Sequence, residues 1–120
     1  MTKKINKVLI ATGGTGGHVF PAYGLAKHLI DKKFHVEIIS DKRGIKYLKK
    51  LNDVKISIIN TSSVYNKDFL QKFISSLIIA YAILKSFIFL IINRPNLVFG
   101  MGGYSSFPIC IVAKLLNIPF

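Results

Sequence analysis

The sequence has 120 residues, which is enough for one domain at most. Lys and Arg number 17 against 5 Asp and Glu, a formal net charge of +12. This charge indicates an anionic membrane, a phosphorylated substrate or nucleic acid as partner, although base composition of a genome that favours Lys, Ile and Asn codons explains part of it as well. No aromatic-basic motif supports nucleic acid, so no nucleic-acid partner is predicted. The single cysteine, Cys110, excludes an internal disulfide and lies in an apolar run typical of a core position.

The first predicted unit is a strand, a glycine loop and a helix. Residues 5–11 are short, β-branched and apolar, as in a buried parallel strand, and are too short an apolar run for a signal peptide. Gly13-Gly14-Thr15-Gly16-Gly17 follows, and a helix is predicted over 18–32 with Pro21 in its first turn. Glycines let the backbone approach a ligand, and the positive end of a helix dipole favours negative charge. The loop therefore predicts an anion site.

This loop matches neither of two common nucleotide-binding motifs. A P-loop ends in Gly-Lys-Ser/Thr, whereas His18 follows Gly17. A dinucleotide fingerprint would need a third glycine where Val19 stands, although Asp41 ends the next strand near the place of a ribose-binding acid. A nicotinamide site is thus weakened but stays open, as does a tight turn without a ligand.

The next elements alternate between strand and helix. Residues 34–39 alternate apolar and polar side chains and predict a second strand. Residues 42–51 carry Ile45, Leu48 and Leu51 among basic residues, which suits a surface helix. Residues 54–59 predict a third strand, and the polar run 60–66 predicts a loop.

Residues 69–92 are the most hydrophobic part of the chain and predict one long helix. Twenty helical residues span about 30 Å, so a helix that crosses a bilayer is one alternative. An ordinary crossover helix and a crossover helix that also touches lipid are the two others. A narrow polar stripe argues against crossing, and it consists of Gln71, Lys72, Ser75, Ser76 and Ser86. For contact with lipid we expect Ile79, Ile83 and Phe87 to supply the apolar face. Around that face, Lys67, Lys72, Lys85 and Arg94 would meet lipid phosphates.

Asn93-Arg94-Pro95 is predicted to end this helix, and a fourth strand follows at 97–99. A second glycine loop occupies 100–106, a helix is predicted over 109–116, and a fifth strand begins at 118–120. The alternation predicts an α/β fold with a doubly wound, Rossmann-like parallel sheet. Both glycine loops then lie at the carboxyl ends of strands, and they could face one cleft.

The two loops together carry a family resemblance. Gly13 to Ala22, read GGTGGHVFPA, and Gly100 to Pro108, read GMGGYSSFP, closely resemble the MurG family, in order and in spacing. The resemblance implies the N-terminal, acceptor-side half of a two-domain GT-B glycosyltransferase. This family transfers N-acetylglucosamine from UDP-N-acetylglucosamine to lipid I, undecaprenyl-diphospho-N-acetylmuramoyl-pentapeptide, and so makes lipid II for peptidoglycan. It acts at the cytoplasmic side of the bacterial inner membrane as a peripheral protein, without a cofactor.

The resemblance also implies roles for the matched positions. Thr15, Gly16 and Gly17 match positions at the donor UDP-N-acetylglucosamine, and His18 matches a histidine beside the reacting groups. For the diphosphate of lipid I, the implied residues are Gly14, Gly102, Gly103, Tyr104 and Ser105. The helix over 69–92 matches the region proposed to touch an anionic membrane.

The sequence also departs from the family. Phe107 stands where the family often has a small residue, and the His-Glu-Gln-Asn stretch expected after Phe120 is absent. The donor domain is absent too, so residues 1–120 are expected to form a truncated acceptor-side domain that transfers no sugar alone. A membrane-attached binding subunit of a split two-chain glycosyltransferase is an alternative.

The chemistry of sugar transfer needs a base for the acceptor hydroxyl and stabilisation of the leaving diphosphate. Among the loop side chains, His18 is the one able to exchange a proton near neutral pH. A helix N-terminus disfavours a charged imidazole, which leaves His18 available as a base. Alternatively, His18 only shapes the loop by hydrogen bonding. His28 and His35 are predicted to be structural or exposed, and no cluster of side chains predicts a metal site.

Overall fold

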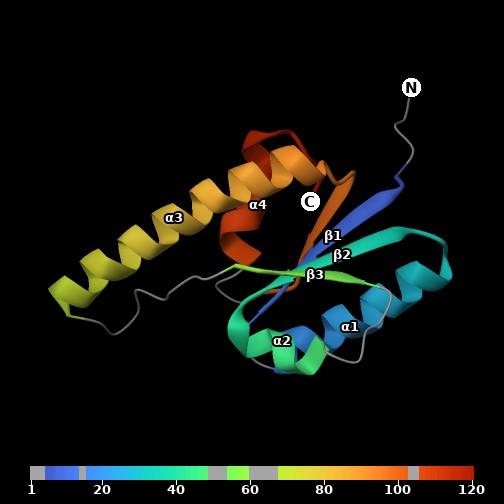
Figure 1. Cartoon of the computed structure of the whole chain (residues 1–120), viewed down its shortest axis with the longest axis horizontal. Helices are drawn as coiled ribbons and strands as arrows, with labels where there is room; N and C mark the ends of the chain where they lie inside the picture. Colours follow the sequence, from blue (N-terminus) through green and yellow to red (C-terminus); the bar gives the residue numbers. More distant parts are fainter. Residues whose placement is uncertain (1–4, 14–15, 49–53, 60–67, 103–105) are drawn as a thin grey trace.

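The computed structural model describes residues 5–13, 16–48, 54–59, 68–102 and 106–120. Strands and helices alternate along the chain (Figure 1). The strands are β1 (Lys7–Ala11), β2 (His35–Ser40), β3 (Lys55–Ile58) and β4 (Leu97–Gly100). The helices are α1 (Gly16–Asp31), α2 (Lys42–Leu48), α3 (Phe69–Asn93) and α4 (Ser106–Leu115).

The four strands form one parallel sheet in the order β3-β2-β1-β4. The chain moves outward from β1 through β2 to β3 and then returns to the other side of β1 as β4. The order therefore reverses at β1, which is the arrangement of a doubly wound sheet. This observation confirms the predicted fold class.

Each face of the sheet is covered by two helices, as Figure 1 shows, with α3 and α4 on one side and α1 and α2 on the other. Alternate residues of β1 point to the two faces because side chains of a strand alternate. Leu9 and Ala11 join the core cluster that contains Leu90 of α3, whereas Val8 and Ile10 join the cluster that contains Val19 of α1. Two separate apolar layers thus hold the sheet between the helix pairs.

The four predicted helices and the first four predicted strands are confirmed, with shifts at their ends, whereas the predicted fifth strand at 118–120 is wrong and the predicted loop at 60–66 lies outside the described residues. Helix α4 begins at Ser106 rather than at Ile109, because Pro108 falls in the first turn, where proline is tolerated. Helix α1 begins at Gly16, so Pro21 lies in its second turn and not in its first. Residues 118–120 form no assigned strand, but the Val98 N–H donates to the Pro119 carbonyl at 2.9 Å, which places this segment beside β4.

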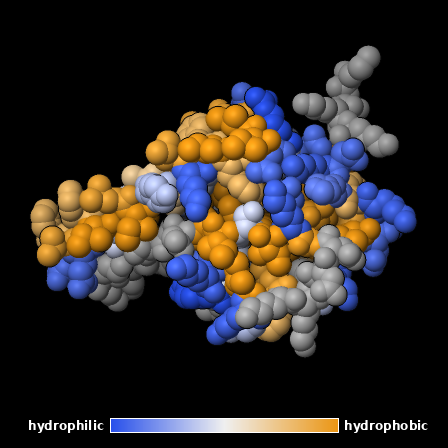
Figure 2. All heavy atoms as spheres, viewed as in Figure 1, coloured by the Kyte–Doolittle hydropathy of each residue, from blue (hydrophilic) through white to orange (hydrophobic). Residues whose placement is uncertain are grey.

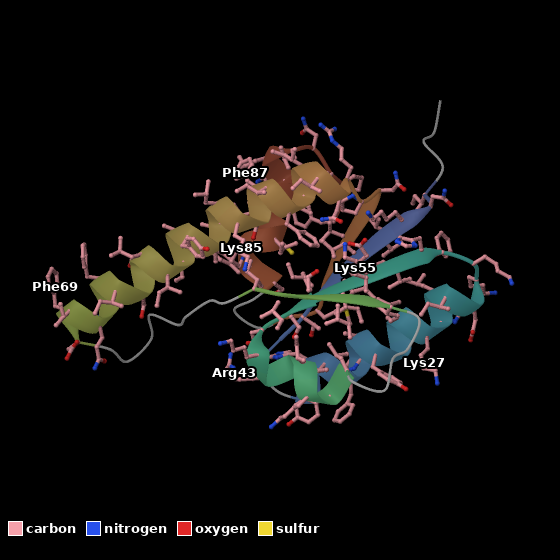
Figure 3. The ribbon with its side chains drawn as sticks, viewed as in Figure 1. Lys27, Arg43, Lys55, Phe69, Lys85 and Phe87 are labelled. Carbon is pink, nitrogen blue, oxygen red and sulfur yellow. The ribbon has the colours of Figure 1, made fainter. Side chains whose placement is uncertain are left out.

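Helix α3 is capped at both ends, and it ends where the sequence predicts. The Asp68 carboxylate accepts a hydrogen bond from the Gln71 N–H at 2.8 Å and so caps the first turn. Arg94 takes a left-handed backbone conformation at φ 42°, and Pro95 follows it. The helix extends well beyond the sheet, with Phe69 at its free end (Figure 3).

Candidate functional site

The two glycine loops meet at one edge of the sheet. The first loop follows β1 and the second follows β4, and these two strands pair directly from Val8–Leu97 to Ala11–Gly100. The Met101 N–H extends this pairing, since it donates to the Ala11 carbonyl at 2.9 Å. Because the strand order reverses at β1, this is the edge at which open α/β sheets bind ligands.

His18 and Gly102 form the contact between the loops. A Cβ added to Gly102 would lie 2.8 Å from His18 Cδ2 and 3.1 Å from His18 Nε2, so the imidazole fills the space beside this glycine. Gly102 also has a φ of +101°, which side-chain-bearing residues rarely adopt. Both facts favour glycine at this position, and they show that residues 18 and 102, 84 positions apart in sequence, lie in contact at this edge of the sheet.

His18 itself is half-buried in the first turn of α1. Its carbonyl accepts a hydrogen bond from Thr12 Oγ1 at 3.0 Å, and the Thr12 N–H donates to the Ile39 carbonyl at 3.0 Å. Thr12 is fully buried and thus ties the loop to β2 and to α1. Sequence reasoning missed this threonine, because a hydroxyl between an apolar strand and a glycine run carries no signal of its own.

Two buried polar atoms without partners lie at this edge, and a third, on Glu37, lies toward the other end of the sheet beside Lys7. Among buried side-chain nitrogen and oxygen atoms of the described residues, three have no hydrogen-bond partner: His18 Nδ1, Ser40 Oγ and Glu37 Oε2. The first belongs to the loop contact described above, and Ser40 is the last residue of β2. Unpaired buried polar atoms are uncommon and concentrate where a ligand or a strained site supplies the missing partner.

Asp41 has a structural role that accounts for its position. Its Oδ1 accepts from the Gly44 N–H at 2.9 Å, and its Oδ2 accepts from Arg43 Nη2 at 2.9 Å. The residue is 6% exposed, so its carboxylate is already occupied by the start of α2. This finding removes the sequence argument that Asp41 binds a nicotinamide ribose.

Cys110 packs against the end of β4. A Cβ added to Gly100 would lie 2.6 Å from Cys110 Sγ, so the thiol fills the space at the end of β4. Burial raises the pKa of the Cys110 thiol above its ordinary value. The thiol is therefore a packing group that resists ionisation.

The structure brings His18, Gly102 and the start of α1 at Gly16 and Gly17 to one place. The predicted binding residues Gly14, Thr15, Gly103, Tyr104 and Ser105 lie outside the described residues, as does Lys67. His28 and His35 are exposed, and His35 Nε2 stands 3.7 Å from the buried Glu37 carboxylate. In the described part of the chain, no three His, Cys, Asp or Glu side chains come together as metal ligands.

A second candidate surface is the outer face of α3. Its large apolar side chains are exposed, and Figure 2 shows them as a continuous hydrophobic surface along the projecting helix. They are Phe69, Leu70, Phe73, Ile74, Leu77, Tyr81, Leu84, Ile88, Ile91 and Ile92. At 3.6 residues per turn these positions fall within one arc of about 140°. We call this surface the α3 apolar face.

The inner face of α3 is made of smaller side chains, and its buried residues are Ser75, Ala82, Ser86 and Leu90. Within the predicted polar stripe, Ser75 and Ser86 face the protein, whereas Gln71, Lys72 and Ser76 are exposed. The predicted lipid-contact residues are wrong as well. Ile83 and Phe87 pack against the core cluster, and Ile79 is only half-exposed. In the described residues, α3 is the one helix long and apolar enough to cross a membrane, a property that the core helix of a soluble protein can share.

Comparison with known proteins assigns the chain to a class. The profile of the glycosyltransferase family 28 N-terminal domain matches residues 8–120, so the chain belongs to this family.

The relatives that this chain resembles carry the name of one transferase. The chain is 39% identical over 112 residues to the Pelagibacter ubique UDP-N-acetylglucosamine--N-acetylmuramyl-(pentapeptide) pyrophosphoryl-undecaprenol N-acetylglucosamine transferase, covering 93% of this chain and 31% of that protein. It is 35% identical over 119 residues to the Francisella tularensis subsp. holarctica protein of the same name, covering 99% of this chain and 32% of the relative. The crystal structure of Acinetobacter baumannii MurG superposes with a TM-score of 0.80 at 29% identity, covering 95% of this chain and 34% of that one. The chain thus spans about a third of the length of these relatives.

Proposed function

We propose that this chain is the acceptor-side domain of a transferase that moves N-acetylglucosamine from UDP-N-acetylglucosamine to lipid I, forming lipid II. The observation that carries the proposal is the contact of His18 with Gly102, which joins the two glycine loops at one edge of the sheet. Donor and acceptor of this reaction each carry a diphosphate, so a transfer site has to hold two of them side by side. Two glycine loops on adjacent strands, each followed by a helix N-terminus, suit that requirement.

We assign the loops by their match to the family. Thr15, Gly16 and Gly17 bind the donor at the start of α1. The acceptor diphosphate binds to Gly14, Gly102, Gly103, Tyr104 and Ser105, between that loop and the start of α4. His18 stands between the two groups and takes the proton of the acceptor hydroxyl. A positive helix end beside each diphosphate stabilises the charge that develops as the donor bond breaks.

The test of the base is His18→Ala in the full-length enzyme, with His28→Ala as the matched control. Both histidines lie on α1, but His28 is exposed near the far end of the helix. We expect His18→Ala to lower kcat by about 10²-fold or more, the usual contribution of a general base. His28→Ala should leave kcat unchanged. A His18→Ala enzyme with near-normal turnover would leave His18 as a loop-shaping residue only.

We also propose that the α3 apolar face binds the cytoplasmic surface of the bacterial inner membrane, where the acceptor lipid is anchored. The geometry supports a helix that lies on the membrane. The C-terminal half of α3 packs on the protein core through Ala82, Ser86 and Leu90, so a helix crossing the bilayer would have to give up these contacts. Lys72, Lys85 and Arg94 are exposed and can meet anionic headgroups.

Vesicle binding tests this surface. The triple variant Leu77→Ser, Leu84→Ser and Ile88→Ser removes three outward side chains that are 54–59% exposed. If each of these side chains is about half buried in the membrane, its replacement loses about 1 kcal/mol of binding free energy, and the triple variant should partition roughly 100-fold more weakly into anionic vesicles. Ile58→Ser, which alters an exposed apolar residue of β3 that is 44% exposed, is the control and should bind like the unaltered protein.

The same vesicles distinguish a helix α3 that lies on the membrane surface from one that crosses the bilayer. Carbonate washing should release the protein, because an interfacial helix is held by one face only. Full retention after washing, with protease cleaving on one side of Lys85 only, would contradict the proposal and indicate a spanning helix.

A further inference from the structure

Thr12 makes a hydrogen bond that the proposed chemistry does not yet include. Its Oγ1 donates to the His18 carbonyl at 3.0 Å, six residues further along the chain. Thr12 is 0% exposed, and its N–H donates to the Ile39 carbonyl at 3.0 Å, so its backbone continues the pairing of β1 with β2. The hydroxyl therefore reaches α1 from a residue whose own position is fixed by the sheet.

The first turn of α1 gains from such a support. The helix begins with Gly16 and Gly17, and glycine weakens a helix because it loses the most backbone freedom on folding. The first N–H groups of any helix also lack partners within the helix, so its end opens more easily than its middle. His18 is the third residue of this turn. The hydrogen bond from the buried Thr12 hydroxyl limits the motion of the backbone at His18.

The imidazole of His18 depends on this backbone for its position. Its Nδ1 is buried and has no hydrogen-bond partner among the described residues, so this nitrogen does not hold the ring in place. The ring lies against Gly102, where an added Cβ would be 2.8 Å from His18 Cδ2. Because a side chain has only a few staggered rotamers, a change of the backbone angles at His18 moves the ring relative to Gly102.

We propose that Thr12 is a positioning residue for His18. Its hydroxyl fixes the first turn of α1 and thereby keeps the imidazole against Gly102. Thr12 acts through His18 and not on a substrate. An effect on turnover rests on the proposed function, because it requires His18 to be the base. The position of the ring is a property of the protein alone and is measured without a reaction.

The first experiment measures kcat and KM of Thr12→Val and Thr12→Ser in the full-length enzyme. Valine keeps the branched shape of threonine without the hydroxyl, and serine keeps the hydroxyl. We expect Thr12→Val to lower kcat about fivefold to tenfold, the size of one hydrogen bond, with little change in KM for UDP-N-acetylglucosamine. Thr12→Ser should retain most of the kcat. In a His18→Ala background, Thr12→Val should lower kcat no further, because its effect passes through the imidazole.

The second experiment measures the position of the ring by NMR, with histidine and glycine labelled selectively. The α-hydrogen of Gly102 that points toward His18 Cδ2 should give a strong nuclear Overhauser effect to the hydrogen on that carbon. Thr12→Val should weaken this effect, and Thr12→Ser should keep it.

The matched control for both experiments is Ser86→Ala. Ser86 is also 0% exposed, and its Oγ donates to the Ala82 carbonyl at 2.7 Å, so it makes the same kind of bond within α3. It should change neither kcat nor the Overhauser effect. If Thr12→Val does not fold, Thr12→Ala takes its place with the same expected results, because it removes the hydroxyl without placing a methyl group there.

Two outcomes overturn the proposal: an Overhauser effect as strong in Thr12→Val as in the unaltered protein, or a loss of kcat that Thr12→Val causes equally with and without the imidazole. The second would show that Thr12 supports the fold and not His18. Failure of the proposed function gives a different result. Near-normal turnover of His18→Ala would reject His18 as the base, and the Overhauser effect would still decide whether Thr12 positions the ring.

Discussion

The contact between the two glycine loops makes Gly102→Ala the most informative substitution in this domain. The new methyl group would sit 2.8 Å from His18 Cδ2, and the residue would have to keep a φ of +101°. A side-chain-bearing residue at such a backbone conformation costs about 1–3 kcal/mol. Forcing an extra carbon against a packed ring costs about 1–3 kcal/mol more. We therefore expect a local penalty of about 2–6 kcal/mol.

The assay combines urea unfolding of the full-length protein with turnover measured at varied lipid I concentration. The penalty should appear either as lost stability or, if the loop moves away from His18, as a raised KM for lipid I. Gly24→Ala is the control, because its Cβ meets nothing within 4 Å in the middle of α1. It should stabilise the protein by up to about 1 kcal/mol through the higher helix propensity of alanine.

A double variant separates the two causes. His18→Ala removes the ring but not the backbone strain, so in that background Gly102→Ala should lose only the packing part of its penalty, about 1–3 kcal/mol. The reasoning would be refuted if Gly102→Ala behaved like Gly24→Ala, or if the penalty were the same with and without the imidazole.

Two further predictions concern the supports of the site. Asp41→Ala should destabilise the protein by about 1 kcal/mol, because the Gly44 N–H loses its hydrogen-bond acceptor at the start of α2. It should not change NADH binding. If the unaltered protein enhanced NADH fluorescence and Asp41→Ala abolished that enhancement, Asp41 would have a role in binding the ribose. Cys110 should react with iodoacetamide more slowly than glutathione does at pH 8, because the raised pKa of its thiol leaves a smaller fraction as thiolate. As the pH is increased further, the Cys110 rate should still rise where the glutathione rate has become constant. A rate equal to that of glutathione would show that the thiol is exposed.

Much of the fold could be predicted because its signals are local. The apolar run before Gly13 and the glycines after it specify a strand, a turn and a helix within 25 residues. The end of α3 was equally predictable, since Pro95 disfavours helical backbone at the residue before it. The family resemblance also depends on two continuous stretches, and the profile match confirms it.

The orientation of α3 could not be read in the same way. Apolar residues lie on all sides of this helix, so periodicity does not distinguish an inner face from an outer one. The choice depends on size: small residues such as Ala82 and Ser86 let the helix approach α4 and the core, and large residues such as Leu84 and Ile88 remain outside. That difference appears only when the partner surface is present.

The sequence by itself determined the elements, the doubly wound class and the two glycine loops, because each is encoded by neighbouring residues. Only the tertiary structure decided which atoms of these loops meet. The packing of His18 against Gly102 and of Ser40 against Gly44 depends on how β1, β2 and β4 align and on where α1 and α2 close over their ends. The contact of His18 with Gly102 joins segments 84 residues apart through excluded volume, and the Gly44 position also brings Ser40 close to Gly13 of another strand end, so no local pattern of residue types carries that information.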